Sequence, residues 1–327
     1  MDNLTHSLTG ALIGQCGLKK KTGLAMPALI IGANLPDVDA ACFFWLDGVE
    51  HLAFRRGITH GPPALLLLPL ALAGLLYGWD KWQARRGKRP EGRLPVNFTW
   101  LYILSLIGCL SHPALDWMNV YGIRLLEPFS SRWFYGDVLF IIDIWLWALL
   151  IFSVWFSLRR EKAGGEWIKP ARAAMAVMLA YIGVNGLISR YAASAGGSES
   201  GEGIEVIASP PPVMFWNRDL IFHTPGADPL VANPMTAKWS LFDPGPVQAF
   251  ASPGGGFAIS NSEGQNSQRP FEELADNPQV APFLFWSRAP FTTCEEGAVI
   301  LGDARYPGRG NFRVELPEIP CEPNPAN

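Results

Sequence analysis

An uncharged run of 18 residues, 62–79, limits what this chain can fold into. As an α-helix it would be about 27 Å long, close to the hydrocarbon thickness of a bilayer. The chain is 49% hydrophobic and 17% charged, which is too apolar for an ordinary soluble enzyme. Further apolar segments lie at residues 4–18, 24–46, 98–111, 138–158 and 171–193. The sequence therefore predicts an α-helical multi-pass membrane bundle of about six helices.

The loops between these segments predict the orientation of the bundle, because Lys and Arg are enriched on the cytoplasmic side. Alternate loops hold most of the cations: Lys19, Lys20, Lys21, Lys81, Arg85, Arg86, Lys88, Arg89, Arg93, Arg159, Arg160, Lys162 and Lys169. The segment 4–18 lacks the basic start and cleavage site of a signal peptide, so we expect it to be retained. Both the N-terminus and the second half are then external.

The chain changes character after residue 193. Residues 1–191 contain 19 Lys and Arg against 13 Asp and Glu, a net charge of +6, whereas residues 192–327 contain 7 against 16, a net charge of −9. Short β-type runs, separated by Pro and Gly turns, follow at 213–216, 219–223, 239–242, 283–286, 298–301 and 312–316. We predict a membrane domain over 1–193, a flexible linker over 194–208 and a small external β-rich domain over 209–327.

Cysteine usage is compatible with an external second half. Cys16, Cys42 and Cys109 fall in apolar segments and are interpreted as small buried side chains. Cys294 and Cys321 lie in the second half, where an oxidising compartment would permit a disulfide. Their spacing alone leaves open whether they pair.

Polar motifs lie at the ends of the apolar segments, where burying a charge or an imidazole is costly and such residues commonly mark function. They are His6, Asp37 and Asp39, His60, His112 with Asp116, and Asp143. In the predicted topology all of them fall near the external leaflet. Each also has a structural interpretation: a surface turn for the Pro36–Asp39 motif, a helix cap at Thr59, or a packing histidine. Pro113 is expected to kink or restart the helix between His112 and Asp116.

Considered together, three imidazoles and several carboxylates without a cysteine are the ligand set of a zinc-like centre holding one or two ions. Manganese and iron fit the same donors. Such ions activate water and polarise phosphoryl or carbonyl oxygens. Hydrolysis is the reaction that this set supports most readily.

The motifs resemble those of the YbcI/YdjM-type bacterial inner-membrane proteins, a family of metal-dependent hydrolases. The matching segments are residues 1–10, 32–39, 56–60, 111–117, 121–122, 128–130 and 140–143, with tail segments 286–290 and 303–306. The resemblance implies a bacterial inner-membrane location. Arg55 and Gly61 stand where the family often has His and Ser, and Pro113 where an aliphatic residue is usual.

That family is more remotely similar to the zinc-dependent phospholipase C and P1 nuclease group. By this likeness the metal ligands would be His6, Asp37, His60, His112 and Asp116. Asp39 and Asp143 would act as a further ligand, as a general base or in orienting the ligands.

We therefore expect a membrane-bound hydrolase that cleaves an ester or phosphoester of a lipid-like substrate at the external face of the inner membrane. Arg56 and Arg124 are candidates for binding a phosphate group, or for anchoring lipid headgroups. Membrane lipids are the expected partners, and no basic patch suits nucleic acid. The alternatives are a non-catalytic scaffold and a metal or ion transporter, although the predicted cytoplasmic halves are almost entirely apolar.

Overall fold

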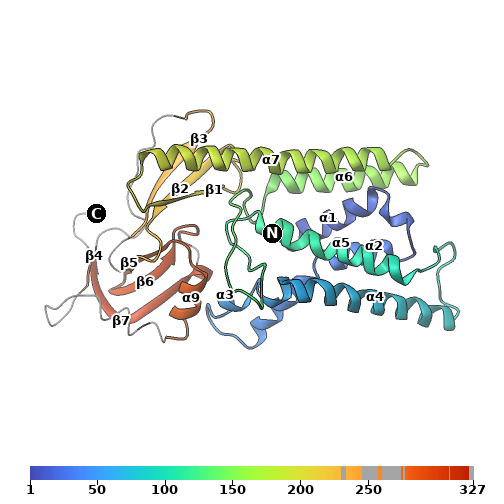
Figure 1. The fold of residues 1–327 in the computed structure, drawn as a ribbon, viewed down its shortest axis with the longest axis horizontal. Helices are drawn as coiled ribbons and strands as arrows, with labels where there is room; N and C mark the ends of the chain where they lie inside the picture. The colour runs from blue at the N-terminus through green and yellow to red at the C-terminus, as the bar shows by residue number, and fades with distance from the viewer. Residues whose placement is uncertain (230–232, 245–256, 260–273, 275–276, 309, 324–327) are drawn as a thin grey trace. The chain divides into compact units, whose positions relative to one another are not determined.

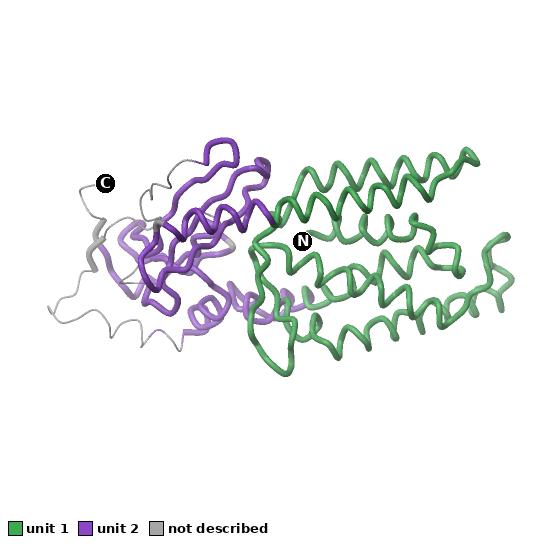
Figure 2. The backbone as a smooth tube through the Cα atoms, turned by 45° about the horizontal axis from the view of Figure 1, so that its top comes forward, with its two compact units in different colours: residues 1–40, 56–186 green, residues 41–55, 187–327 purple. Residues whose placement is uncertain are grey.

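The computed structural model describes residues 1–229, 233–244, 257–259, 274, 277–308 and 310–323, and the chain divides into two compact units. Unit 1 comprises residues 1–40 and 56–186, and unit 2 comprises residues 41–55 and 187–327 (Figure 2). Residues 41–55 therefore belong with the C-terminal part of the chain, although they lie between two segments of unit 1.

Unit 1 is helical (Figure 1). Its helices are α1 (Asn3–Gln15), α2 (Ala25–Gly32), α4 (Pro62–Arg85), α5 (Phe98–Trp117), α6 (Ile144–Lys162) and most of α7 (Ile168–Glu199). Short 3-10 turns at η1 (Leu18–Lys20), η2 (Leu35–Phe44) and η3 (Ile58–His60) connect them. The helix starts follow local chemistry, since Asp2 caps α1 by accepting from two backbone amides, and Pro62 occupies the first turn of α4.

Three helices among the described residues are long and apolar enough to cross a membrane: α4, α5 and α7. The pair α2 and η2 also passes this test, but it bends by 50° between its halves. α1 has 13 residues and would extend about 20 Å. The structure thus supports a helical membrane region with three or up to four candidate spans, while the full count of about six helices stays a prediction.

Glycines allow the backbones of α1, α2 and α5 to approach closely. A Cβ atom on Gly10 would lie 2.7 Å from the Leu29 carbonyl oxygen, and one on Gly108 would lie 2.5 Å from the same oxygen. A Cβ on Gly32 would lie 2.7 Å from the Ser105 carbonyl oxygen. Small residues at such contacts are how membrane helices pack without bulky side chains. This packing brings α1, which carries His6, close to α5, which carries His112 and Asp116.

The basic segments lie together at one end of unit 1 (Figure 1). Lys19 pairs with Glu161 and also lies 4.3 Å from the ring centre of Trp167. The amide of Gly23 donates to the Pro95 carbonyl at 3.1 Å, which joins the first basic loop to the second. The grouping agrees with the loop pattern on which the predicted orientation depends.

Unit 2 contains two small antiparallel sheets. The first has the order β1 (Glu205–Ser209), β2 (Asn217–His223), β3 (Met235–Ser240). The second has the order β4 (Phe257–Ile259), β7 (Arg313–Pro323), β6 (Ala298–Asp303), β5 (Pro290–Glu295). Two short helices complete it, α3 (His51–Phe54) and α9 (Val280–Trp286). The β-rich character expected of this region is present.

Three details of unit 2 differ from the sequence expectations or decide between them. The predicted strand at 283–286 is wrong: it forms the end of α9, because Val280, Phe283 and Trp286 recur at helical spacing and all three are buried. Cys294 and Cys321 form a disulfide with their Cα atoms 5.9 Å apart. α7 continues to Glu199, into the predicted linker, and its Ile188 and Ala192 pack against the first sheet.

Candidate metal centre

Four fully buried side chains form the core of the site: His6 of α1, His60 of η3, and His112 and Asp116 of α5. Together with Asp37, which is partly buried, they make two groups, and within each group the potential ligand atoms all lie within 4.8 Å of one another. The first group is His6, Asp37 and His112, and the second is His60, His112 and Asp116. Because His112 belongs to both, the five residues form one continuous cluster.

His112 is oriented by the end of α2. Its Nδ1 donates to the carbonyl of Ala33 at 2.7 Å, which leaves the lone pair on Nε2 available to a ligand. Within the described residues Nε2 makes no hydrogen bond, and it lies 3.5 Å from Asp116 Oδ2 and 3.8 Å from Asp37 Oδ1. α5 is continuous through Pro113, so the expected restart does not occur and the spacing of His112 and Asp116 is helical.

His60 is held by a relay of two hydroxyl contacts. Its Nδ1 lies 2.9 Å from Thr59 Oγ1, and that hydroxyl donates to Asp39 Oδ2 at 3.1 Å. Asp39 Oδ2 also accepts from the backbone amide of Arg56 at 2.8 Å. Asp39 is thus placed behind His60, where it orients the imidazole and fixes the start of the following segment.

His6 stacks on His112 with ring centres 3.8 Å apart and ring planes 19° apart. Its Nε2 lies 3.3 Å from Asp116 Oδ1. Neither ring nitrogen of His6 makes a well-formed hydrogen bond among the described residues. A buried imidazole in this state is costly unless something coordinates it.

Asp116 is the anionic centre of the cluster. The Nε atom of Arg56 lies 3.0 Å from Asp116 Oδ2, and the amino group of Met1 also contacts this carboxylate. The Arg56 guanidinium donates to Asn119 Oδ1 and to the Gly122 carbonyl, both at 3.1 Å. Asn119 was not identified from sequence, because a single Asn near a helix end carries no distinctive pattern.

Two of the predicted site residues, Arg124 and Asp143, make contacts with residues outside the cluster. Arg124 donates to Glu127 Oε1 at 2.9 Å and lies over the ring of Trp133. Asp143 caps α6 by accepting from the amide of Leu146, and the hydroxyl of Tyr181 donates to both of its oxygens. Asp143 belongs to neither of the two potential ion-holding groups found among the described residues.

Gly61 is explained by a close backbone approach. A Cβ atom at this position would lie 1.8 Å from the carbonyl oxygen of Glu127. In this chain the residue that follows His60 must therefore be glycine, because any side chain would begin with this Cβ.

Residues 1–192 match the family described as YdjM inner membrane protein. The chain belongs to the YdjM inner membrane protein family. An uncharacterized protein, YfhP of Bacillus subtilis (strain 168), is 26% identical over 167 residues, which are 48% of this chain and 47% of that relative. The match thus spans about half the length of the relative. No solved structure is significantly similar.

The family match covers every site residue predicted from the sequence, from His6 to Asp143. The donor set fits a divalent transition metal, because it combines imidazoles with carboxylates and keeps His112 Nε2 directed into the cluster. We conclude that the membrane half of this family member has a buried His and Asp cluster able to hold a metal ion.

Proposed function

We propose that this protein is a membrane-bound metal-dependent hydrolase that acts on an ester or phosphoester of a lipid-like substrate. The observation that carries the proposal is the buried cluster itself. Three imidazoles and Asp116 are fully buried and closely spaced. The Nε2 atom of His112 points into this cluster and makes no hydrogen bond among the described residues. Histidines that serve only packing normally have their ring nitrogens satisfied by hydrogen bonds.

Each residue of the cluster has a proposed role. One or two ions would be held by His6, Asp37, His60, His112 and Asp116; zinc suits these donors, and manganese and iron are the alternatives. A bound ion of this kind supplies a Lewis acid and lowers the pKa of water toward neutrality. Ala33 and Thr59 fix the ring orientations of His112 and His60. Asp39 contacts the Nδ1 side of His60 through Thr59, which supports a role in orienting this imidazole.

Arg56 supplies a positive charge beside Asp116. Arg124 lies next to Arg56, because the Arg124 amide donates to the Arg56 carbonyl at 3.0 Å. We propose that the pair binds the anionic part of the substrate when Asp116 is engaged with an ion. The membrane location supports a substrate that reaches the cluster from the lipid phase.

The proposed orientation places unit 2 outside the cytoplasm. The disulfide between Cys294 and Cys321 supports this, because such bonds persist in oxidising compartments. The basic loops lie together at one end of unit 1, and this grouping supports the same orientation.

Metal content tests the proposal first. We expect detergent-purified wild-type protein to contain near-stoichiometric zinc, manganese or iron by elemental mass spectrometry, and His112→Ala to lose it. His51→Ala is the matched control, because His51 lies in unit 2 and its ring contacts the Gly48 carbonyl. Metal-free wild type after reconstitution would overturn the proposal in favour of a scaffold.

Activity is tested second, on the metal-loaded protein. We expect hydrolysis of a chromogenic phosphoester or carboxylate ester in mixed micelles, abolished in Asp116→Asn and retained in His51→Ala. Bound metal without hydrolysis of any ester class would leave a structural metal centre and contradict the hydrolase assignment.

A further inference from the structure

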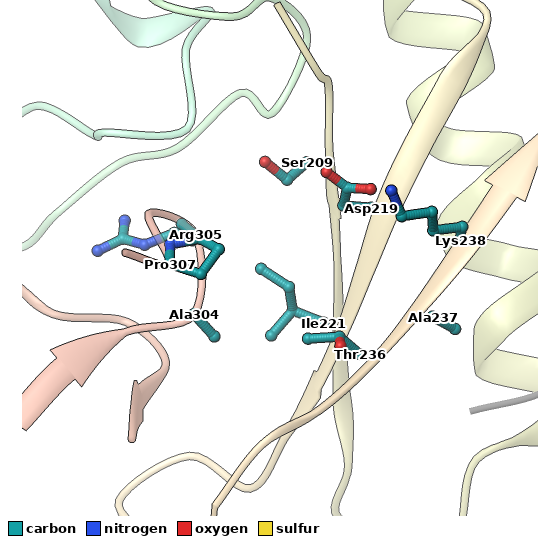
Figure 3. A pocket seen from close by; sticks show the side chains of 9 residues that line it. All are labelled: Ser209, Asp219, Ile221, Thr236, Ala237, Lys238, Ala304, Arg305 and Pro307. Carbon is teal, nitrogen blue, oxygen red and sulfur yellow. The ribbon is translucent and has the colours of Figure 1, made fainter. Parts of the chain in front are cut away.

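Unit 2 contains a cavity of about 490 Å³ that plays no part in the proposed hydrolysis. One face of the β1–β3 sheet forms one side of it, and the turn after β6 forms the other (Figure 3). The two sheets touch next to this cavity, where Ile207 and Ile221 pack against Phe291 and Ala304. The volume lies within the range of small-molecule binding pockets in proteins.

A row of three polar side chains crosses the sheet at the cavity. Ser209 of β1 pairs in register with Asp219 of β2, and Asp219 pairs with Lys238 of β3. Residues directly opposite one another on antiparallel strands point to the same face, and neighbouring strands are about 4.8 Å apart. Figure 3 shows Asp219 lying between the Ser209 hydroxyl and the Lys238 amino group.

This row is not satisfied by the rest of the described chain. Neither the Ser209 hydroxyl nor the Asp219 carboxylate makes a hydrogen bond to another described residue, although Ser209 is only 5% exposed. Burial raises the pKa of Asp219, and the charge of Lys238 opposes that rise. Polar groups left in this state favour a ligand that can pair with them.

The remaining charged wall residue is already neutralised. The guanidinium of Arg305 donates to both oxygens of Asp303 at 2.8 Å and points away from the polar row (Figure 3). Ile221, Ala304 and Pro307 make the rest of the lining largely apolar. The cavity therefore offers one anionic and one cationic group side by side, next to an apolar wall.

We propose that this cavity binds a small zwitterion, a molecule with an ammonium group close to an oxyanion and an apolar remainder. The ammonium group donates to Asp219 and Ser209, the oxyanion accepts from Lys238, and the remainder lies against Ile221 and Pro307. Two sources share this chemistry: a free apolar amino acid, and the aminoethyl phosphate group of a lipid head. Asp219 and Lys238 lie on neighbouring strands, which are about 4.8 Å apart. This spacing suits the ammonium group and the oxyanion of both molecules.

Isothermal titration calorimetry of the full-length protein in a maltoside detergent tests the inference. The probes are L-leucine and O-phosphoethanolamine, with isobutylamine and inorganic phosphate as singly charged comparisons. We expect one zwitterion to bind about tenfold or more tightly than either comparison, because only it engages both charges. Binding of leucine identifies an amino acid site, and binding of phosphoethanolamine a headgroup site.

Variants separate this cavity from other binding. Asp219→Asn and Lys238→Met should each weaken the zwitterion by about tenfold or more. Glu205→Gln is the matched control, because Glu205 lies on the same sheet with a side chain that is 60% exposed. Absence of zwitterion binding by folded protein, or equal binding by Asp219→Asn, overturns the inference. Neither result depends on metal content, so the proposed hydrolase stands or falls separately.

Discussion

Arg56 Nε lies 3.0 Å from Asp116 Oδ2, and both side chains are buried. The arginine adopts a positive φ of 55°, which non-glycine residues rarely do, and this conformation is held by Asp39 and by the contacts of the guanidinium. The guanidinium of Arg56 therefore compensates the negative charge of Asp116.

Replacing Arg56 with Met should therefore destabilise the metal-free protein more than the metal-loaded protein. Removing one partner of a buried ion pair costs about 3–5 kcal/mol, but a bound cation would replace the lost charge. Thermal unfolding in detergent, with chelator and with added zinc, measures both states. An equal loss of stability in the two conditions would show that Arg56 has no electrostatic link to an ion.

Thr59→Val should weaken metal binding by about 10- to 100-fold, because the relay from Asp39 to His60 loses its hydroxyl. Thr59→Ser keeps the hydroxyl and serves as the control. Competition with a chromogenic chelator gives the affinity. Unchanged affinity in Thr59→Val would remove Asp39 from the proposed site.

Gly61→Ala should lower the melting temperature markedly, since the added Cβ would lie 1.8 Å from the Glu127 carbonyl oxygen. Gly74→Ala is its control, because Gly74 lies within α4 with nothing within 4 Å of an added Cβ. Helix propensity predicts that Gly74→Ala is neutral or stabilising by up to about 1 kcal/mol. A harmless Gly61→Ala would contradict the close approach.

Unit 2 should lose stability as the pH falls below about 4. Burial alone would raise the pKa of Asp303, but the charge of Arg305 and hydrogen bonds from Arg305 and Ser287 hold it below its ordinary value. A carboxyl whose pKa is lowered by folding stabilises above its unfolded pKa, and that contribution disappears as the pH drops through the folded pKa. Hydrogen exchange of β6 amides against pH measures this, and Asp303→Asn should flatten the dependence.

Replacing both Cys294 and Cys321 with Ser should lower the free energy of unfolding of unit 2 by about 3 kcal/mol, because the bridge closes a loop over a sequence separation of 27. Hydrogen exchange of β5 and β7 in the full-length protein reports the change. Equal protection with and without the bridge would assign it no stabilising role.

The membrane character and the ligand candidates could be predicted from sequence because they depend on local patterns. Uncharged apolar runs require helices in a bilayer, and His112 and Asp116 share a helix face by their spacing alone. The sequence identified Cys294 and Cys321 as a possible pair, but it could not decide whether they form a disulfide, because sequence spacing does not give the distance between the two residues. The run at 283–286 is short enough to suit either a strand or a helix, and packing of Phe283 and Trp286 selected the helix.

The sequence by itself therefore determined the division between an apolar, basic half and an acidic, β-rich half, together with the residues able to bind a metal. Only the tertiary structure decided which of them meet. It joined His6, Asp37, His60, His112 and Asp116 in one cluster, set Asp39 behind His60 through Thr59, and gave Asp143 to the cap of α6. The reason is that close backbone contacts at Gly10, Gly32 and Gly108 bring distant segments together, and no local pattern encodes which helix faces will touch.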